Sequence, residues 1–314
     1  MPLSVLICTH NPRREYLART LAALQHQSLP AADWELLLID NASAPPIAGQ
    51  VDLSWHPRAR VIVEPTLGLT PARLRAIREA KTELLVFVDD DNVLAPDFLA
   101  EALRLAQARP FIGSFGCSIR AVYEKEPAGI LREWVSLLTV GEFTDERWSN
   151  LGVLGGEVLT LPSGAGLVIR TNVAREYARL AETDPLRKGL DRRGADLTGS
   201  GDRDLAATSV RLGLGTGKFP TLKLDHLIPA GRVEAAYLIR LAEATAYGEV
   251  ILYYLHGLPW RPAPQSGSRK LLAAWERRHL SPLERELRAA QATGTARAVA
   301  MIELAAREKL EAGS

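Results

Sequence analysis

The first third of the chain alternates short apolar runs with helix-like patterns, and this alternation limits the fold more than any other feature. Leu3–Cys8 and Leu84–Val88 are apolar at almost every position, which is typical of strands covered by helices on both faces. Helical patterns lie between such runs, at about 13–27 and 71–80. Similar short runs occur at Glu35–Ile39 and Val61–Val63. The pattern predicts an α/β fold with a Rossmann-like, mostly parallel sheet.

Composition excludes several classes of protein. The 314 residues carry 38 Lys+Arg against 37 Asp+Glu, a formal net charge of +1, so there is no broad positive field and we expect no nucleic-acid partner. Cys8 and Cys117 belong to no CxxC or Cys/His cluster, which argues against structural zinc and suits the cytoplasm. No run approaches the ~18 apolar residues that cross a bilayer. We therefore expect any membrane contact to be peripheral, at the inner face of the membrane.

Polar side chains follow the predicted strands at the points where they end. Thr9 and Asn11 follow the first strand, Asp40 follows the second, and Asp89–Asp91 follows the run at 84–88. In a parallel sheet these ends share one edge, where ligands bind. Asp40 is either a turn residue or an acceptor for the N–H groups of a nucleobase.

Three adjacent carboxylates repel one another unless a cation lies among them. Carboxylate oxygens suit Mg²⁺ or Mn²⁺, which commonly bridge protein acids to a diphosphate. The alternative for Asp89–Asp91 is a solvated acidic turn before the next helix.

Four blocks, in order, resemble the successive motifs of family 2 glycosyltransferases of GT-A fold: Ser4–Asn11, Trp34–Ser43, Gly68–Arg73 and Val86–Asn92. The resemblance extends over residues 3–108 and 160–230. It implies an inverting enzyme of EC class 2.4 that moves a sugar from a nucleotide diphosphate sugar to an acceptor hydroxyl, usually with Mn²⁺ or Mg²⁺.

The resemblance also implies roles for individual residues. Donor-binding residues would be Thr9, Asn11, Asp40, Arg73, Asp89, Asp90, Gly164 and Ala165. The acidic triplet would be the DXD-type motif, with Asp91 as a metal ligand and His226 completing the metal shell. A lone histidine is otherwise more often structural. The turn that holds Gly164 and Ala165 would line the donor-sugar pocket, or is a plain turn.

A second acidic segment, Leu197–Leu205, resembles the family's Gly-Glu-Asp-x-Asp-Leu motif, whose acid is the catalytic base. Gly201 stands where a glutamate is usual, which leaves Asp202 as the predicted base and Asp204 as the fallback. The reaction needs one carboxylate within hydrogen-bond reach of the attacking hydroxyl. The alternative is that Asp202 merely caps the helix it begins.

We divide the chain into a GT-A domain at 1–256, a linker at 257–268 and a helical C-terminal extension at 269–314. Within the domain, we expect a nucleotide-binding half at about 1–118 and an acceptor half at about 119–230. The extension has apolar residues at helical spacing, so it packs on the domain, forms a homodimer or lies on a lipid surface.

Two other functions fit parts of the sequence. A sugar-nucleotide nucleotidyltransferase would share the sheet and the acidic site, but the chain has Cys8–Pro12 where a glycine-rich triphosphate loop is needed. A non-catalytic relative that binds nucleotide sugars is suggested by the missing glutamate at 201. The acceptor is expected to be a carbohydrate or lipid-linked molecule of polysaccharide or glycolipid synthesis, by family analogy alone.

Overall fold

The computed structural model describes residues 2–150, 160–261 and 279–312. These residues form a nine-stranded sheet in the order β3-β2-β1-β4-β8-β6-β9-β5, with β7 also paired to β9. The strands are β1 (Leu3–Thr9), β2 (Trp34–Asn41), β3 (Ala59–Glu64), β4 (Leu84–Phe87), β5 (Asn92–Leu94), β6 (Ile112–Tyr123), β7 (Arg147–Ser149), β8 (Leu167–Arg170) and β9 (Gly215–Ile228).

The sheet is parallel in its N-terminal part and mixed beyond it. β3, β2, β1 and β4 pair in parallel, as the alternating pattern predicts. β8 runs antiparallel to both of its neighbours, β4 and β6, and β5 and β7 run antiparallel to β9. The sequence pattern shows where a strand lies but not its direction, so these antiparallel pairs were not anticipated.

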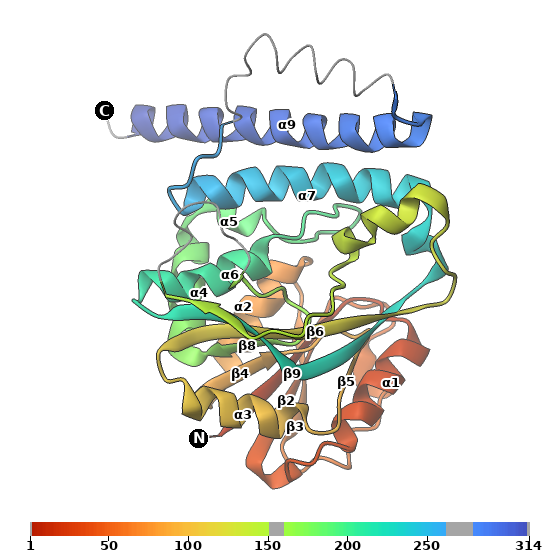
Figure 1. The fold of residues 1–314 in the computed structure, drawn as a ribbon. Coiled ribbons are helices and arrows are strands. Elements are labelled where there is room, and N and C mark those ends of the chain that lie inside the picture. The colour runs from red at the N-terminus through yellow and green to blue at the C-terminus, as the bar shows by residue number, and fades with distance from the viewer. Residues whose placement is uncertain (1, 151–159, 262–278, 313–314) are drawn as a thin grey trace.

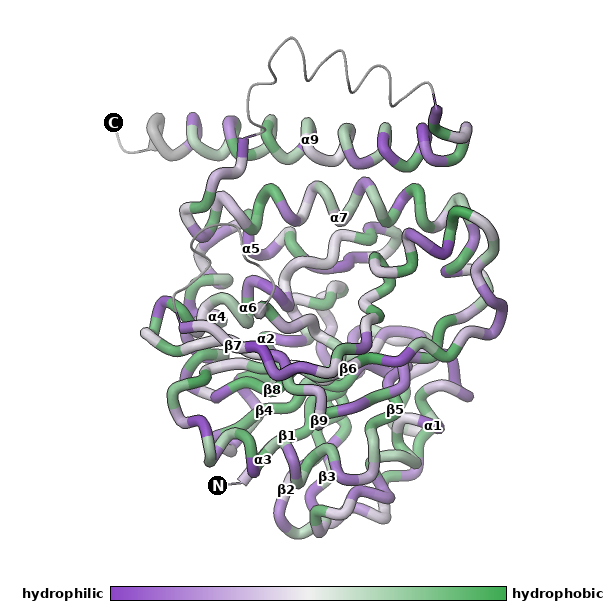
Figure 2. The backbone as a smooth tube through the Cα atoms, viewed as in Figure 1, coloured by the Kyte–Doolittle hydropathy of each residue, from purple (hydrophilic) through white to green (hydrophobic). Residues whose placement is uncertain are grey.

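Helices cover both faces of the sheet (Figure 1). The helices around the sheet are α1 (Arg14–Gln25), α2 (Leu69–Glu79), α3 (Phe98–Ala108), α4 (Thr171–Thr183), α5 (Pro185–Lys188) and α6 (Gly201–Arg211), with 3-10 helices at η1 (Ala31–Asp33), η2 (Ile47–Gly49), η3 (Gly129–Leu138) and η6 (Ala230–Val233). Val5 and Ile7 face the core under α1 and α3, whereas Leu6 faces the core under α2, α4 and α6. Burial on both faces is why these strands are continuously apolar. Figure 2 shows the hydrophobic residues gathered around β4 and β8 and a hydrophilic stretch at β7.

Two long helices, α7 (Ala235–Leu255) and α9 (Pro282–Ala312), lie side by side above the α/β body (Figure 1). Leu287, Ala298 and Ile302 of α9 are buried against the helices beneath. A Cβ added to Gly294 would stand 2.0 Å from the carbonyl oxygen of Glu243, so a glycine is needed for this close crossing.

The C-terminal extension therefore packs on its own chain, which is the first of the three alternatives. The predicted linker at 257–268 is described only to residue 261, and the beginning of the extension, 269–278, also lies outside the described residues. Where the structure describes the chain, no helix is long and apolar enough to cross a membrane.

Candidate active site

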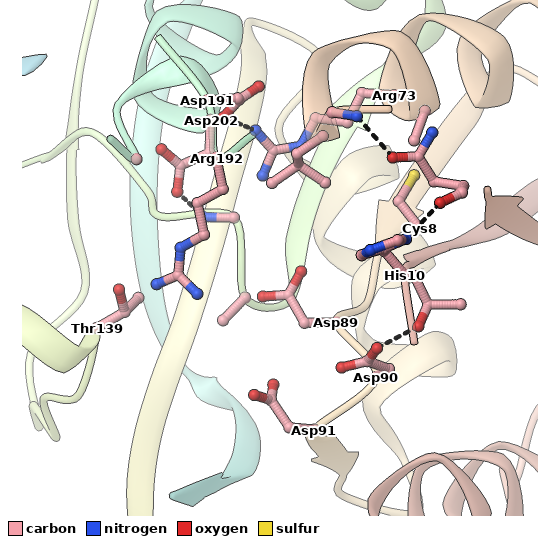
Figure 3. A pocket seen from close by; sticks show the side chains of 18 of the residues that line it. Cys8, His10, Arg73, Asp89, Asp90, Asp91, Thr139, Asp191, Arg192 and Asp202 are labelled. Carbon is pink, nitrogen blue, oxygen red and sulfur yellow. Dashed lines mark hydrogen bonds and ion pairs between the residues drawn. The ribbon is translucent and has the colours of Figure 1, made fainter. Parts of the chain in front are cut away.

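A cavity of about 260 Å³ opens at the carboxyl ends of β1 and β4. It is bordered by the segments after these strands, by the segment between α5 and α6, and by β9 and η6. Most of the predicted site residues line it: Thr9, Arg73, Asp89, Asp90, Asp91, Gly164, Ala165, Asp202 and His226. Figure 3 shows the three adjacent carboxylates facing one open space, into which Arg192 extends from the opposite wall.

The acidic triplet is crowded and largely unneutralised. The hydroxyl of Thr9 donates to Asp90 Oδ2. Burial, and then the charge of Asp91, raise the pKa of Asp90 to about 7, and the same two causes raise the pKa of Asp89. Burial also raises the pKa of Asp91, but the hydrogen bond from His226 and the charge of Arg232 outweigh it, so that this pKa lies below its usual value. A cluster that resists full ionisation is one that a cation would stabilise.

His226 reaches the triplet through strand pairing. The antiparallel register of β5 and β9 sets Asn92 opposite His226, and His226 Nε2 lies 3.5 Å from Asp91 Oδ2. Asp91 and His226 are each 6% exposed, and His226 Nδ1 has no hydrogen-bond partner.

His226 Nε2 and Asp91 Oδ2 fit a shared divalent cation, because a ligand pair 3.5 Å apart can lie about 2.1 Å from one ion. Among the described residues, no group of three or more His, Cys, Asp and Glu side chains is arranged to hold a metal. The described part of the chain thus offers Asp91 and His226 as a pair of side-chain ligands, which suits an ion that is also held by substrate phosphates and water.

Arg73 is fixed by an acid that the sequence analysis did not single out. Its Nη1 donates to Asp191 Oδ1 at 2.7 Å, and Thr70 Oγ1 donates to the other oxygen of Asp191 at 2.9 Å. Burial lowers the pKa of Arg73, but the negative charges around it, Asp191 first, raise this pKa by more. The guanidinium therefore remains a cation. Asp191 therefore positions Arg73 at the cavity wall.

Asp191 also explains the glycine at 201. A Cβ added to Gly201 would stand 2.4 Å from the carboxyl carbon of Asp191. The space that a glutamate side chain at 201 would enter is therefore occupied by a carboxylate from another part of the chain. The departure from the family motif is accommodated without an empty space.

Asp202 lies where three segments converge. The backbone N–H of Gly164 donates to Asp202 Oδ2, and the N–H of Arg203 donates to Oδ1 at 2.7 Å. A Cβ at Gly164 would stand 2.8 Å from Arg73 Nη2 and 3.0 Å from Asp202 Oδ2. Glycine is thus required for this close approach. Asp202 also lines a second cavity of about 630 Å³ below α7, together with Arg203, Lys218, Glu249 and Tyr253.

Three predicted site residues do not line the first cavity. Asp40 is 1% exposed, and its carboxylate accepts from the N–H groups of Ser43 and Ile47 at 3.0 and 2.9 Å. Asn11 accepts from the N–H of Ala44 at 2.9 Å. The loop after β2 thus engages both oxygens of Asp40, and of the residues assigned to nucleobase and metal only Asp91 and His226 line this cavity.

Asp204 is the third predicted site residue that does not line the first cavity. Two residues after Asp202, it points about 200° away around α6 and is fully buried against Arg187 and His256. The structure does not bring this fallback base to the cavity.

Sequence reasoning missed several residues that line the cavity, including Asp191, Arg192 and Arg232. The first two lie in the charged and glycine-rich stretch at 185–201, which was a usable sign. Arg232 belongs to no motif.

Comparison with known proteins gives a consistent result. Residues 4–155 match the family model described as Glycosyl transferase family 2. A putative glycosyltransferase, EpsH, of Bacillus subtilis is 26% identical over 104 residues, which is 33% of this chain and 30% of that protein. An uncharacterised protein, y4gI, of Sinorhizobium fredii is 30% identical over 112 residues, which is 34% of this chain and 12% of that protein. The chain thus matches less than a third of the length of these relatives.

Solved structures share the fold. A mannosyltransferase from Pyrobaculum calidifontis, in complex with GDP-Man and Mn²⁺, aligns over 98% of this chain and 80% of its own, with a TM-score of 0.54 and 20% identity. TarS 1–349 of S. aureus in complex with UDP-GlcNAc aligns over 81% of this chain and 71% of its own, with a TM-score of 0.52 and 14% identity. The predicted GT-A fold with additional C-terminal helices is confirmed.

Proposed function

Because residues 4–155 belong to glycosyl transferase family 2, we propose that this glycosyltransferase moves a sugar from a nucleoside diphosphate sugar to an acceptor hydroxyl, with inversion at the anomeric carbon. One observation carries the proposal: Asp91 and His226 line the same cavity as Asp202 and Arg73. The two residues proposed to hold a cation and the proposed base thus border one space.

The donor would lie along the carboxyl edge of the sheet. We assign its ribose, diphosphate and sugar to Thr9, Arg73, Asp89, Asp90 and the backbone at Gly164–Ala165, since all of them line the cavity. For the nucleobase we propose the adjoining ends of β1 and β2, where Asn11 lies and where Asp40 holds the loop after β2 through the N–H groups of Ser43 and Ile47. Similar folds bind UDP-GlcNAc and GDP-Man, so UDP- and GDP-sugars are the donors to test first.

Asp91 and His226 would hold Mn²⁺ or Mg²⁺. When bound, the ion neutralises charge on the departing diphosphate. Arg73 stays cationic through Asp191 and supplies a second positive charge to the same space. Among the described residues, no third His, Cys, Asp or Glu side chain joins these two in a metal-binding group.

Asp202 would take the proton of the attacking hydroxyl. It borders both the donor cavity and the larger cavity below α7, so we assign the larger cavity to the acceptor. Its polar and aromatic lining, which includes Ser163, Lys218 and Tyr253, suits a carbohydrate or lipid-linked acceptor of polysaccharide or glycolipid synthesis.

We also keep the cytoplasm as the proposed location, which the two free cysteines support. On α9, Met301 is 41% exposed and Leu304 51% exposed. This apolar surface is where a homodimer contact or a peripheral membrane contact would form.

The test is the release of nucleoside diphosphate from a panel of UDP-, GDP- and dTDP-sugars, with and without Mn²⁺. We expect metal-dependent release from one donor class, with inversion seen by NMR of the product. Release of pyrophosphate from a nucleoside triphosphate and a sugar phosphate would instead support a nucleotidyltransferase. Binding of donor without turnover, for every acceptor tried, would support the non-catalytic alternative.

A further inference from the structure

Arg232 lies directly against the two proposed metal ligands. It belongs to η6, which follows β9. Its Nη1 donates to Asp91 Oδ2 at 3.0 Å and lies 3.4 Å from His226 Nε2. The Arg232 side chain is 25% exposed and borders the cavity.

The guanidinium and a metal ion would use the same carboxylate oxygen. An ion bound about 2.1 Å from Asp91 Oδ2 would lie within about 5 Å of Arg232 Nη1, since that oxygen and Nη1 are 3.0 Å apart. Two cations at this separation, in a largely buried site, repel each other strongly. Binding of the ion would therefore destabilise the contact between Arg232 and Asp91.

A diphosphate offers Arg232 another partner. The planar guanidinium matches two phosphate oxygens at once. Arg232 borders the same cavity as Arg73 and Arg192. A diphosphate bound in that cavity would therefore lie near the guanidinium of Arg232. The side chain can then exchange one anionic partner for another without losing its charge compensation.

We propose that Arg232 couples metal binding to donor binding: it competes with the ion for Asp91 when no diphosphate is bound, and it pairs with the diphosphate when one is. This inference rests on the proposed function of the site. Coupling between two ligands is reciprocal, so the metal and the nucleotide raise each other's affinity by the same factor. Arg232 would be a donor-binding residue that makes the site bind metal and donor together.

The test measures the affinity of the full chain for Mn²⁺ by the electron paramagnetic resonance signal of the free ion, with and without saturating UDP or GDP. In the wild-type protein we expect the nucleotide to raise the Mn²⁺ affinity at least about tenfold. In Arg232→Gln we expect Mn²⁺ alone to bind about tenfold more tightly and the enhancement by nucleotide to shrink. Arg232→Lys keeps the charge and should resemble the wild type for Mn²⁺ alone.

Arg120→Gln is the matched control, because Arg120 forms an ion pair with Asp225 and its side chain is 63% exposed. It should leave both affinities unchanged. Mn²⁺ affinity that is unchanged or weaker in a folded Arg232→Gln protein overturns the inference while leaving the proposed function intact. A wild-type chain that binds neither Mn²⁺ nor any nucleotide overturns the proposed function, and this inference with it.

Discussion

Two clusters of acids, one bordering the first cavity and one between α5, α6 and the end of α7, differ in how their charge is balanced. The cavity cluster, Asp89–Asp91 with His226, borders an open space and has more carboxylates than cations around it. The junction cluster consists of Asp204, Arg187 and His256, and it joins α6, α5 and the end of α7. Asp204 Oδ1 contacts Arg187 Nη1 and lies 2.7 Å from His256 Nε2.

The difference in charge balance distinguishes a cluster that stabilises the fold from one that is suited to bind a ligand. In the junction cluster a carboxylate that is 0% exposed is matched by an adjacent guanidinium, so its charges hold helices together. In the cavity cluster the pKa values of Asp89 and Asp90 are raised, which is typical of groups kept for a ligand. Charge balance and access to a cavity, rather than the presence of Asp beside His, distinguish the two clusters.

The largest expected effect comes from Asp202→Asn, which tests the cavity side of α6. We expect kcat for transfer to fall by about 10²–10⁴-fold, because the amide cannot accept the acceptor's proton. The affinity for donor nucleotide, measured by calorimetry, should change little. A fully active variant would remove the assignment of Asp202 as the base.

Asp204→Asn tests the junction side of the same helix. It leaves Arg187 as a buried and unpaired cation, so we expect a loss of about 3–5 kcal/mol in the free energy of unfolding, measured by urea denaturation. The kcat of the remaining folded protein should be unchanged. Asp225→Asn, at a surface ion pair with Arg120, should not measurably change stability. Loss of kcat with normal stability in Asp204→Asn would reverse the roles of the two acids.

Asp91→Asn tests the cavity cluster itself. Removing this ligand should lower metal-dependent turnover on the order of 100-fold, because the leaving diphosphate loses its counter-charge. Treatment of the wild type with a chelator should give the same loss, and added Mn²⁺ should restore it in the wild type alone. Thermal unfolding should confirm that the fold is intact. Equal turnover with and without chelator would contradict a metal site here.

Asp191 and Arg73 refine the comparison, since they form a balanced buried pair that nevertheless lines the cavity. Gly201→Ala should cost about 1–3 kcal/mol of stability, because its Cβ would press on the Asp191 carboxylate. In a double-mutant cycle, Asp191→Ala should remove most of that cost. Additive costs would show that the two sites are not in contact.

The sequence by itself determined the α/β class, the parallel N-terminal strands and the strand-end position of Thr9 and Asp89–Asp91. These features follow from local patterns, because a buried strand is continuously apolar and its polar continuation marks the ligand-binding edge. The family blocks lie in the same local segments. The directions of β8, β5 and β7 have no such local sign.

Only the tertiary structure decided which charges meet. Asp91 and Arg232 are 141 residues apart in sequence, and Arg73 and Asp191 are 118 apart. Likewise, Asp202 and Asp204 look alike in sequence, yet α6 turns one to the cavity and the other to Arg187. Such contacts depend on strand pairing and helix packing between distant segments, which residue spacing along the chain does not encode.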